Sequence, residues 1–212
     1  GAGHDRTQLF DKVPSAIMTS ATLTVGKSGS FDFFKSRIGL TQTGAQRWGS
    51  AVEVPAKDQD FYALRNVPHG QLREVFFHSK STDSTRRAFV YTPPDYDQNP
   101  EKRYPVLYLQ HGWGENEYGW GVQGRAREIM DNLIAENKTR PFIIVMIYGM
   151  TNETRMGGLR DFDIGPFETV LVKELIPFVD ANFRTLSDQP NRAMAGLSMG
   201  GMETRTVTLR NL

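Results

Sequence analysis

A serine between two glycines is the part of the sequence most able to do chemistry. Gly196, Leu197, Ser198, Met199 and Gly200 match the G-x-S-x-G pattern, in which a sharp strand-to-helix turn exposes a nucleophilic serine. Side chains at the two glycine positions would collide with the neighbouring strand and helix. The alternative interpretation is a glycine-rich turn that only packs a helix against a sheet. The pattern favours Ser198 as the nucleophile of an acyl-transfer reaction.

A second glycine turn could supply the hydrogen bonds that such a reaction needs. The segment His111-Gly112-Trp113-Gly114 directly follows the apolar run "YPVLYLQ". Acyl transfer needs two backbone N–H groups directed at the developing oxyanion, one from the residue after the serine and one from the loop after an earlier strand. We therefore predict that Met199 and Trp113 donate, with Gly112 as the second choice in the loop. A plain turn at the end of a strand remains the alternative.

Two residues just past this turn are candidates for substrate binding. Glu115 and Trp120 could line an acyl or sugar pocket, or they could belong to a solvated loop. Among the histidines, His69 and His78 are expected to be surface or strand residues, and His111 is expected to brace its turn rather than act as a base.

The sequence contains only half of such an active site. In this kind of enzyme an Asp or Glu and then a His follow the serine along the chain. Residues 199–212 contain Glu203 but no Asp and no His, and Glu203 is expected to point the wrong way for a triad acid. We expect that the chain is a truncated form of a longer enzyme of this kind and is inactive alone. A non-catalytic remnant that binds carbohydrate is the alternative.

The elements that would position these residues alternate between strands and helices. Residues 70–79 and 85–92 alternate apolar and polar side chains, which predicts an antiparallel hairpin at one edge of a sheet. Apolar runs at 104–110 and 140–150 predict central parallel strands, and 191–196 predicts a short strand before the serine. Helical spacing appears at 124–139, where Ile129, Met130, Leu133 and Ile134 would form the apolar face.

A second helical pattern covers residues 165–183, with Pro177 expected to kink it or to mark a boundary. A third helix is expected at 197–212. Strands alternating with helices predict an α/β fold with a mostly parallel sheet covered on both faces. The first 60 residues show loops and short strands, "ATLTVGKSGSFDFF" among them, without a helical period. We therefore predict an irregular or β-rich extension at 1–60 and one α/β domain at 61–212.

Composition excludes several classes of protein. The 212 residues carry a net charge of +1, with 39% hydrophobic and 23% charged residues, so neither a nucleic-acid surface nor a membrane surface is indicated. The chain has no cysteine, which rules out disulfides and thiolate metal sites. Asp161 and Asp163 lie close together but lack spaced histidine partners, so we predict no metal site and no cofactor.

Several separate motifs, in the right order, resemble one family. "RRAFVYTPPDYD", "YPVLYLQHGWGENEYGW", "MTNETRMGGLRDFDIGPFETVLVKELIPFVDANFRT" and "NRAMAGLSMGG" are similar to the feruloyl esterases of carbohydrate esterase family 1, in the esterase D and antigen 85 group. The resemblance covers about residues 61–212. It implies a three-layer α/β/α hydrolase fold, here incomplete at the C-terminus, with Ser198 as nucleophile and an oxyanion hole formed by Met199 and the Gly112–Trp113 turn.

The same resemblance implies a substrate and a location. The expected partners are feruloylated arabinoxylan or feruloyl oligosaccharides, without nucleic acid or membrane, and the expected location is secreted or periplasmic. The runner-up is a short-acyl esterase or acyltransferase of the same superfamily. In many bacterial relatives a small carbohydrate-binding β-domain precedes the esterase, and "RWGSAVEVP" resembles the junction between the two.

Overall fold

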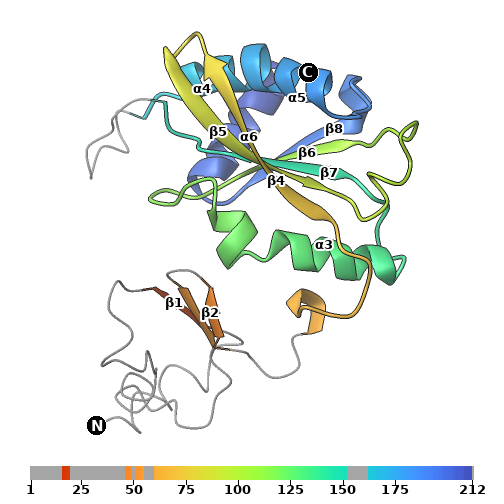
Figure 1. Ribbon diagram of the computed structural model, residues 1–212. Coiled ribbons are helices and arrows are strands. Elements are labelled where there is room, and N and C mark those ends of the chain that lie inside the picture. The colour runs from red at the N-terminus through yellow and green to blue at the C-terminus, as the bar shows by residue number, and fades with distance from the viewer. Residues whose placement is uncertain (1–15, 20–45, 49–50, 55–59, 152–161, 212) are drawn as a thin grey trace, which may run out of the picture. The chain divides into compact units, whose positions relative to one another are not determined.

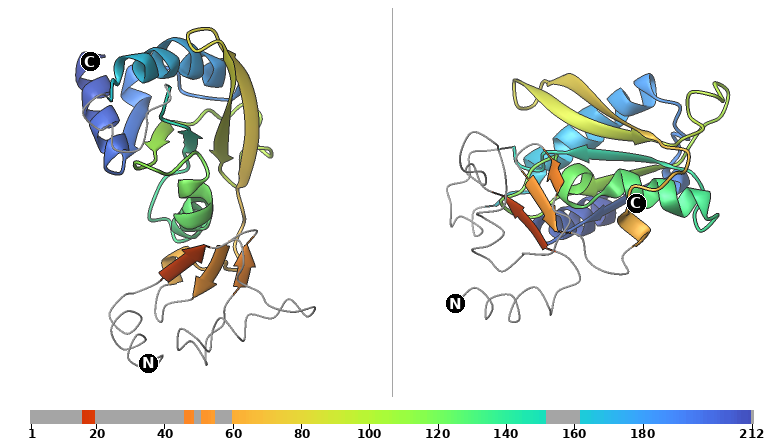
Figure 2. Two further views of the ribbon diagram at one scale, coloured as in Figure 1. Left: turned by 90° about the vertical axis from the view of Figure 1, so that its left-hand side faces the viewer. Right: turned by 60° about the horizontal axis from the view of Figure 1, so that its bottom comes forward.

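The computed structural model describes residues 16–19, 46–48, 51–54, 60–151 and 162–211. The chain divides into two compact units, Gly1–Asp60 and Phe61–Leu212. Figures 1 and 2 show the elements of both units from three directions.

The described part of the first unit is a small antiparallel sheet. Its strands are β1 (Ala16–Thr19), β2 (Gln46–Trp48) and β3 (Ala51–Val54), in the order β1-β3-β2. The segment "ATLTVGKSGSFDFF", predicted to contain strands, lies outside the described residues. The kinship of this unit to a carbohydrate-binding domain remains a prediction.

The second unit is built on a five-stranded sheet in the order β4-β5-β7-β6-β8 (Figure 1). The strands are β4 (Gln71–Ser79), β5 (Ser84–Thr92), β6 (Val106–Gln110), β7 (Ile143–Ile147) and β8 (Arg192–Gly196). The predicted hairpin of β4 and β5 is confirmed at one edge. β5 also pairs antiparallel with β7, whereas β6 pairs parallel with both β7 and β8, so the sheet is mixed.

The burial of the two central strands differs. All five residues of β7 are buried, as the continuous apolar run predicts for a strand covered on both faces. In β6 burial alternates, and Leu107 and Leu109 are only partly buried. The prediction of a fully buried strand was therefore wrong for β6, because one of its faces is less covered than the other. β5 ends at Thr92, where two prolines interrupt the backbone hydrogen bonding.

Helices cover the two faces of the sheet unequally (Figures 1 and 2). α3 (Ala126–Ala135) packs Met130 against one face. The opposite face carries a continuous helical stretch and then α6 (Met199–Arg210), which contributes Val207 to the larger core. The stretch consists of α4 (Gly165–Thr169), the π-helical η5 (Val170–Leu175) and α5 (Ile176–Asn182). Pro177 lies at the start of α5, so the predicted boundary is confirmed.

The buried face of α3 is only partly the one that the apolar spacing predicted, since Met130 is buried and Ile134 packs against the same core, but polar residues are buried as well. Ile129, Leu133 and Ile134 are only partly buried, whereas Glu128, Asp131 and Asn132 are buried. Glu128 pairs with its chain neighbour Arg127, whereas Asp131 and Asn132 have long-range partners, so their buried polar groups are hydrogen-bonded. The Asp131 carboxylate accepts hydrogen bonds from the Tyr91 hydroxyl and the Gly70 N–H, and lies 3.0 Å from the His69 ring. The Asn132 amide donates to two backbone carbonyls of residues 61 and 63.

Candidate active site

The strand-turn-helix arrangement predicted around Ser198 is present. β8 ends at Gly196 and α6 begins at Met199, and Ser198 between them has φ 52° and ψ −108°. A positive φ is uncommon for a residue with a side chain and stores backbone strain, which is typical of functional turns. The Leu197 N–H donates to the Gln110 carbonyl at 3.2 Å, so the turn is tied to the end of β6. Ser198 is exposed to solvent.

The two glycines of the motif are needed for close packing. A Cβ on Gly196 would lie 2.3 Å from the carbonyl carbon of Gly200. A Cβ on Gly200 would lie 2.7 Å from the carbonyl oxygens of both Gln110 and His111. Backbone atoms cannot move out of the way as a flexible side chain can, so these positions require glycine. The backbone of the turn therefore packs directly against the end of β6, with no room for a side chain between them.

The Met199 N–H lies at the first turn of α6, among the amides that have no carbonyl partner within the helix. The partial positive charge of a helix N-terminus favours an anion at this place. Because Met199 directly follows Ser198, its amide is in the position predicted for the first oxyanion donor. The Met199 side chain is buried, which anchors the start of the helix.

The turn after β6 is held by hydrogen bonds to its own backbone. The Gly112 N–H donates to the Glu115 carboxylate at 2.7 Å, and the Glu115 N–H donates to the Gly112 carbonyl at 3.2 Å. The Trp113 N–H has no hydrogen-bond partner among the residues that the structure describes. These contacts favour Trp113 over Gly112 as the second oxyanion donor, and that role remains a prediction.

His111 braces the site, as predicted. Its side chain is 1% exposed, its Nδ1 donates to the Gly112 carbonyl at 2.8 Å, and its Nε2 accepts from the Gly149 N–H at 2.9 Å. These partners require the neutral ring with its proton on Nδ1. Burial also lowers the pKa of His111 below its usual range. The ring thus joins the loops that follow β6 and β7, and neither nitrogen is left to accept a proton from Ser198.

The two residues proposed for substrate binding also support the turn. The Trp120 indole N–H, in the π-helical η3 (Gly119–Gln123), donates to the Gln110 carbonyl at 2.8 Å. The Glu115 carboxylate is held on Gly112. Both side chains are half-buried. Substrate contact by Trp120 remains a prediction, whereas the hydrogen bond of Glu115 to Gly112 favours a supporting role for that side chain.

The described residues do not bring a catalytic base to Ser198. His69 pairs with Asp131 beside the end of β5. This end of the sheet is opposite the one at which β8 leads into Ser198. His78 lies on edge strand β4 with an exposed ring, 3.9 Å from Asp83. His4 and Asp161 lie outside the described residues. Within the described part of the chain, no group of three or more histidines and acids could hold a metal ion, and no helix is long and apolar enough to cross a membrane.

Sequence reasoning missed that Glu203 is a buried acid. Its side chain is 0% exposed, and neither carboxylate oxygen has a hydrogen-bond partner among the described residues. A Cβ on Gly149 would lie 2.8 Å from one of these oxygens, so the carboxyl packs against the loop after β7. Burial raises the pKa of Glu203 to about 8. The acidic residue type alone favoured an exposed position, and only the packing of α6 shows otherwise.

The stability of the folded protein is expected to fall as Glu203 ionises. The folded pKa of about 8 exceeds the ordinary value of 4.5, so between these values the folded state binds one proton more than the unfolded state. Stability therefore decreases as pH rises through this window, by on the order of 3–5 kcal/mol in full. Glu203→Gln should raise Tm at about pH 9 much more than at about pH 5.

Thermal unfolding across this pH range measures the effect, with the exposed Glu101→Gln as matched control. An equal change in Tm at both ends of the range would contradict the buried, neutral state of Glu203.

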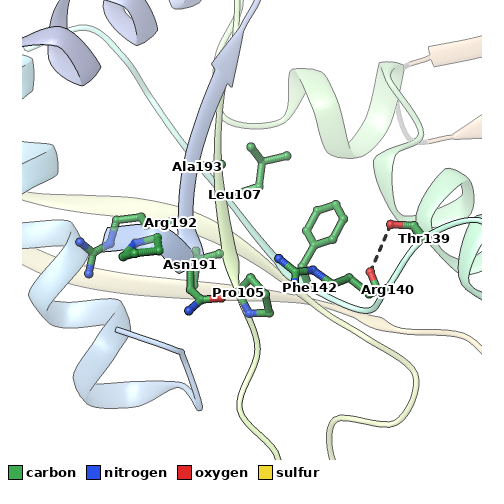
Figure 3. A pocket seen from close by; sticks show the side chains of 10 residues that line it. Pro105, Leu107, Thr139, Arg140, Phe142, Asn191, Arg192 and Ala193 are labelled. Atoms are coloured by element: carbon green, nitrogen blue, oxygen red, sulfur yellow. Dashed lines mark hydrogen bonds between the residues drawn. The ribbon is translucent and has the colours of Figure 1, made fainter. Parts of the chain in front are cut away.

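A pocket among the described residues lies away from the serine. It has a volume of about 270 Å³ and is lined by residues from the starts of β6 and β8 and from the 139–142 loop. Figure 3 shows Leu107, Phe142 and Ala193 around it. β6 and β8 run parallel, so both strands start at the end of the sheet that is opposite Gln110 and Gly196. This pocket is therefore not part of the candidate active site.

Comparison with known proteins agrees with the fold. The family model described as "Putative esterase" matches residues 79–206. A xylanase/feruloyl esterase of Xylanibacter ruminicola is 56% identical over 171 residues, which cover 79% of this chain and 24% of that protein. A solved ferulic acid esterase is 33% identical with a TM-score of 0.60, over 67% of this chain and 56% of the other.

The fold is shared with a more distant structure as well. A ferulic acid esterase of Anaeromyces mucronatus, solved with ferulic acid, is 24% identical with a TM-score of 0.62, over 74% of this chain and 59% of the other. The chain thus spans about a quarter of the curated relative and little more than half of the solved structures. With the family match, the mixed sheet and the elbow, this chain belongs to the esterase family of α/β-hydrolases, of the esterase D-like type that includes feruloyl esterases.

Proposed function

We propose that the protein containing this chain is a serine esterase that hydrolyses feruloyl esters on plant arabinoxylan through an acyl-enzyme. The observation that carries this proposal is the strained, exposed Ser198 at the strand-to-helix elbow, tied to the end of β6 where the His111–Gly114 turn begins. The names of the relatives support the feruloyl substrate.

The reaction follows from these groups. A base supplied by the protein outside the described residues takes the proton of the Ser198 hydroxyl, and the oxygen attacks the ester carbonyl. The N–H groups of Met199 and Trp113 stabilise the oxyanion that forms. The sugar alcohol leaves with a proton and the acyl group remains on Ser198. Water then attacks this acyl-enzyme, releasing ferulic acid and restoring the serine.

Apolar side chains around the elbow support an aromatic acyl group. Leu197 is 52% exposed beside Ser198, and Tyr148 is 40% exposed and stacks on His111 at 5.4 Å. Trp113 meets Phe162 edge to face, with ring centroids 5.7 Å apart. A contiguous exposed apolar patch is typical of a binding surface, and we propose that these side chains form one. We expect them to contact the feruloyl ring rather than a short acyl chain.

The full-length protein should therefore hydrolyse methyl ferulate and feruloylated arabinoxylan in preference to p-nitrophenyl acetate. Release of ferulate and of nitrophenol, compared as kcat/KM, measures this preference. A preference for the acetyl ester would favour a short-acyl esterase, and transfer of the acyl group to an added sugar would favour an acyltransferase. Turnover of none of these esters would favour a non-catalytic carbohydrate-binding protein.

The proposed substrate also indicates a location. Arabinoxylan is a polymer outside the cell, and its feruloylated fragments are large, so we propose a secreted or periplasmic enzyme. Activity on methyl ferulate in the culture medium or the periplasmic fraction, rather than in the cytoplasmic fraction, is the expected result.

A further inference from the structure

We infer that Glu115 is a positioning residue for the oxyanion turn, acting through Gly112 and not through contact with substrate. This inference rests on the proposed esterase function. The carboxylate of Glu115 occupies the N–H of Gly112, the second candidate donor of the turn, and thereby leaves the Trp113 N–H to face the reacting carbonyl.

The geometry is a reciprocal pair of hydrogen bonds, which we name the Gly112–Glu115 clasp. The Gly112 N–H donates to Glu115 Oε2 at 2.7 Å, a short distance typical of a bond to a charged acceptor. In return the Glu115 N–H donates to the Gly112 carbonyl at 3.2 Å. The two hydrogen bonds join the first and last residues of the segment Gly112–Glu115. The peptide group that carries the Trp113 N–H lies between these residues and is therefore held in one orientation.

The clasp also fits the turn against the elbow. The position that a Cβ would take on Gly112 lies 3.2 Å from Glu115 Oε2 on one side and 3.6 Å from Leu197 Cδ2 on the other. Gly112 is thus held between the clasp and the residue that precedes Ser198. The Gly112 carbonyl also accepts from His111 Nδ1 at 2.8 Å, which ties the same peptide to the loop after β7.

The location of the carboxylate suits a positioning role. Glu115 Oε2 lies 3.7 Å from the Cβ position of Gly119, so the acid is folded back onto its own loop. A carboxylate directed at the reacting carbonyl would repel the developing oxyanion. The hydrogen bond to the Gly112 N–H holds the Glu115 carboxylate on the turn instead. The hydrogen bond, and not the charge, is therefore the feature on which catalysis depends.

The length and the hydrogen-bonding capacity of the side chain can be tested separately in the full-length protein. Glu115→Gln keeps an acceptor oxygen at the same reach, Glu115→Asp keeps the charge but is one methylene too short, and Glu115→Ala removes both. We expect Asp and Ala to lower kcat by ~10- to 100-fold with KM changed less than about threefold, because a loosened donor acts mainly in the transition state. Gln should keep at least about a third of kcat.

A matched control lies in the same loop. The Asn116 side chain accepts from the Tyr118 N–H at 3.0 Å and does not touch Gly112, so Asn116→Ala should keep kcat within about twofold. A second readout is binding of an arylboronic acid, which forms a tetrahedral adduct on the serine. Its affinity should fall in parallel with kcat/KM in the Asp and Ala variants, while inhibition by ferulate stays unchanged.

The outcomes separate this inference from the proposed function. Wild-type turnover by Ser198→Ala would overturn the function itself. If that variant is inactive but Glu115→Asp and Glu115→Ala keep normal kcat, the function stands and the positioning role is wrong. A raised KM with normal kcat would mean that Glu115 contacts substrate, which also overturns it. If the Ala variant fails to fold, the contrast between Gln and Asp decides, since equal kcat in these two contradicts the clasp.

Discussion

Ser198→Ala is expected to lower kcat for methyl ferulate by ~10⁵-fold or more in the full-length protein, with the fold unchanged. Loss of the nucleophile in serine hydrolases leaves only the catalysis that the oxyanion hole and substrate binding provide. The elbow itself should persist, because alanine occupies no more space than serine. The turn is also held by the backbone hydrogen bond from the Leu197 N–H to the Gln110 carbonyl. Ferulate release and thermal unfolding measure the two parts of this prediction.

A serine elsewhere provides the control. Ser187 is exposed, and its backbone carbonyl accepts a hydrogen bond from Arg192 at 2.7 Å, a contact that does not involve the hydroxyl, so Ser187→Ala should leave both activity and Tm unchanged. Ser198→Ala with more than about 1% of wild-type kcat would show that another residue is the nucleophile.

Gly200→Ala is expected to have the largest effect on stability, lowering the free energy of unfolding by about 3 kcal/mol or more. The added Cβ would lie 2.7 Å from two carbonyl oxygens and from Gln110 Cβ, at the point where α6 crosses the end of β6. Relief requires α6 to move away from the sheet, which would also displace the Met199 amide from the serine. Activity should therefore fall together with Tm.

The next residue is a closely matched control. Gly201 lies in the same helix, and a Cβ there would be 3.4 Å from the Gly196 carbonyl oxygen, an ordinary contact. Gly201→Ala should be neutral or stabilising by up to ~1 kcal/mol, because alanine favours the helix over glycine. Equal Tm values for Gly200→Ala and Gly201→Ala would contradict the close approach of α6 to β6.

Local sequence patterns determined the elements of the second unit and the chemistry at its elbow. The hairpin of β4 and β5, the long helical stretch with its boundary at Pro177, and the strand and helix around Ser198 were all predictable. Each depends on residues that are near one another in the chain: alternation over nine residues, apolar spacing along one helix, or two glycines flanking a serine. Ser198 and Met199 could be proposed for the same reason.

The tertiary structure alone decided which groups support that chemistry. The His111 ring is fixed by Gly149, 38 residues further along the chain, and the polar face of α3 is buried because Asp131 meets Gly70 and His69, about 60 residues earlier. Glu203 loses contact with water only when α6 packs against the sheet. Local propensity cannot encode such pairings, since the hydrogen-bond partners of these buried polar groups come from distant segments of the chain. Where a buried acid such as Glu203 has no partner within the described part of the chain, burial raises its pKa. The sequence therefore identified Ser198 and its turn, and the packing of β6, β7 and α6 determined how that turn is held.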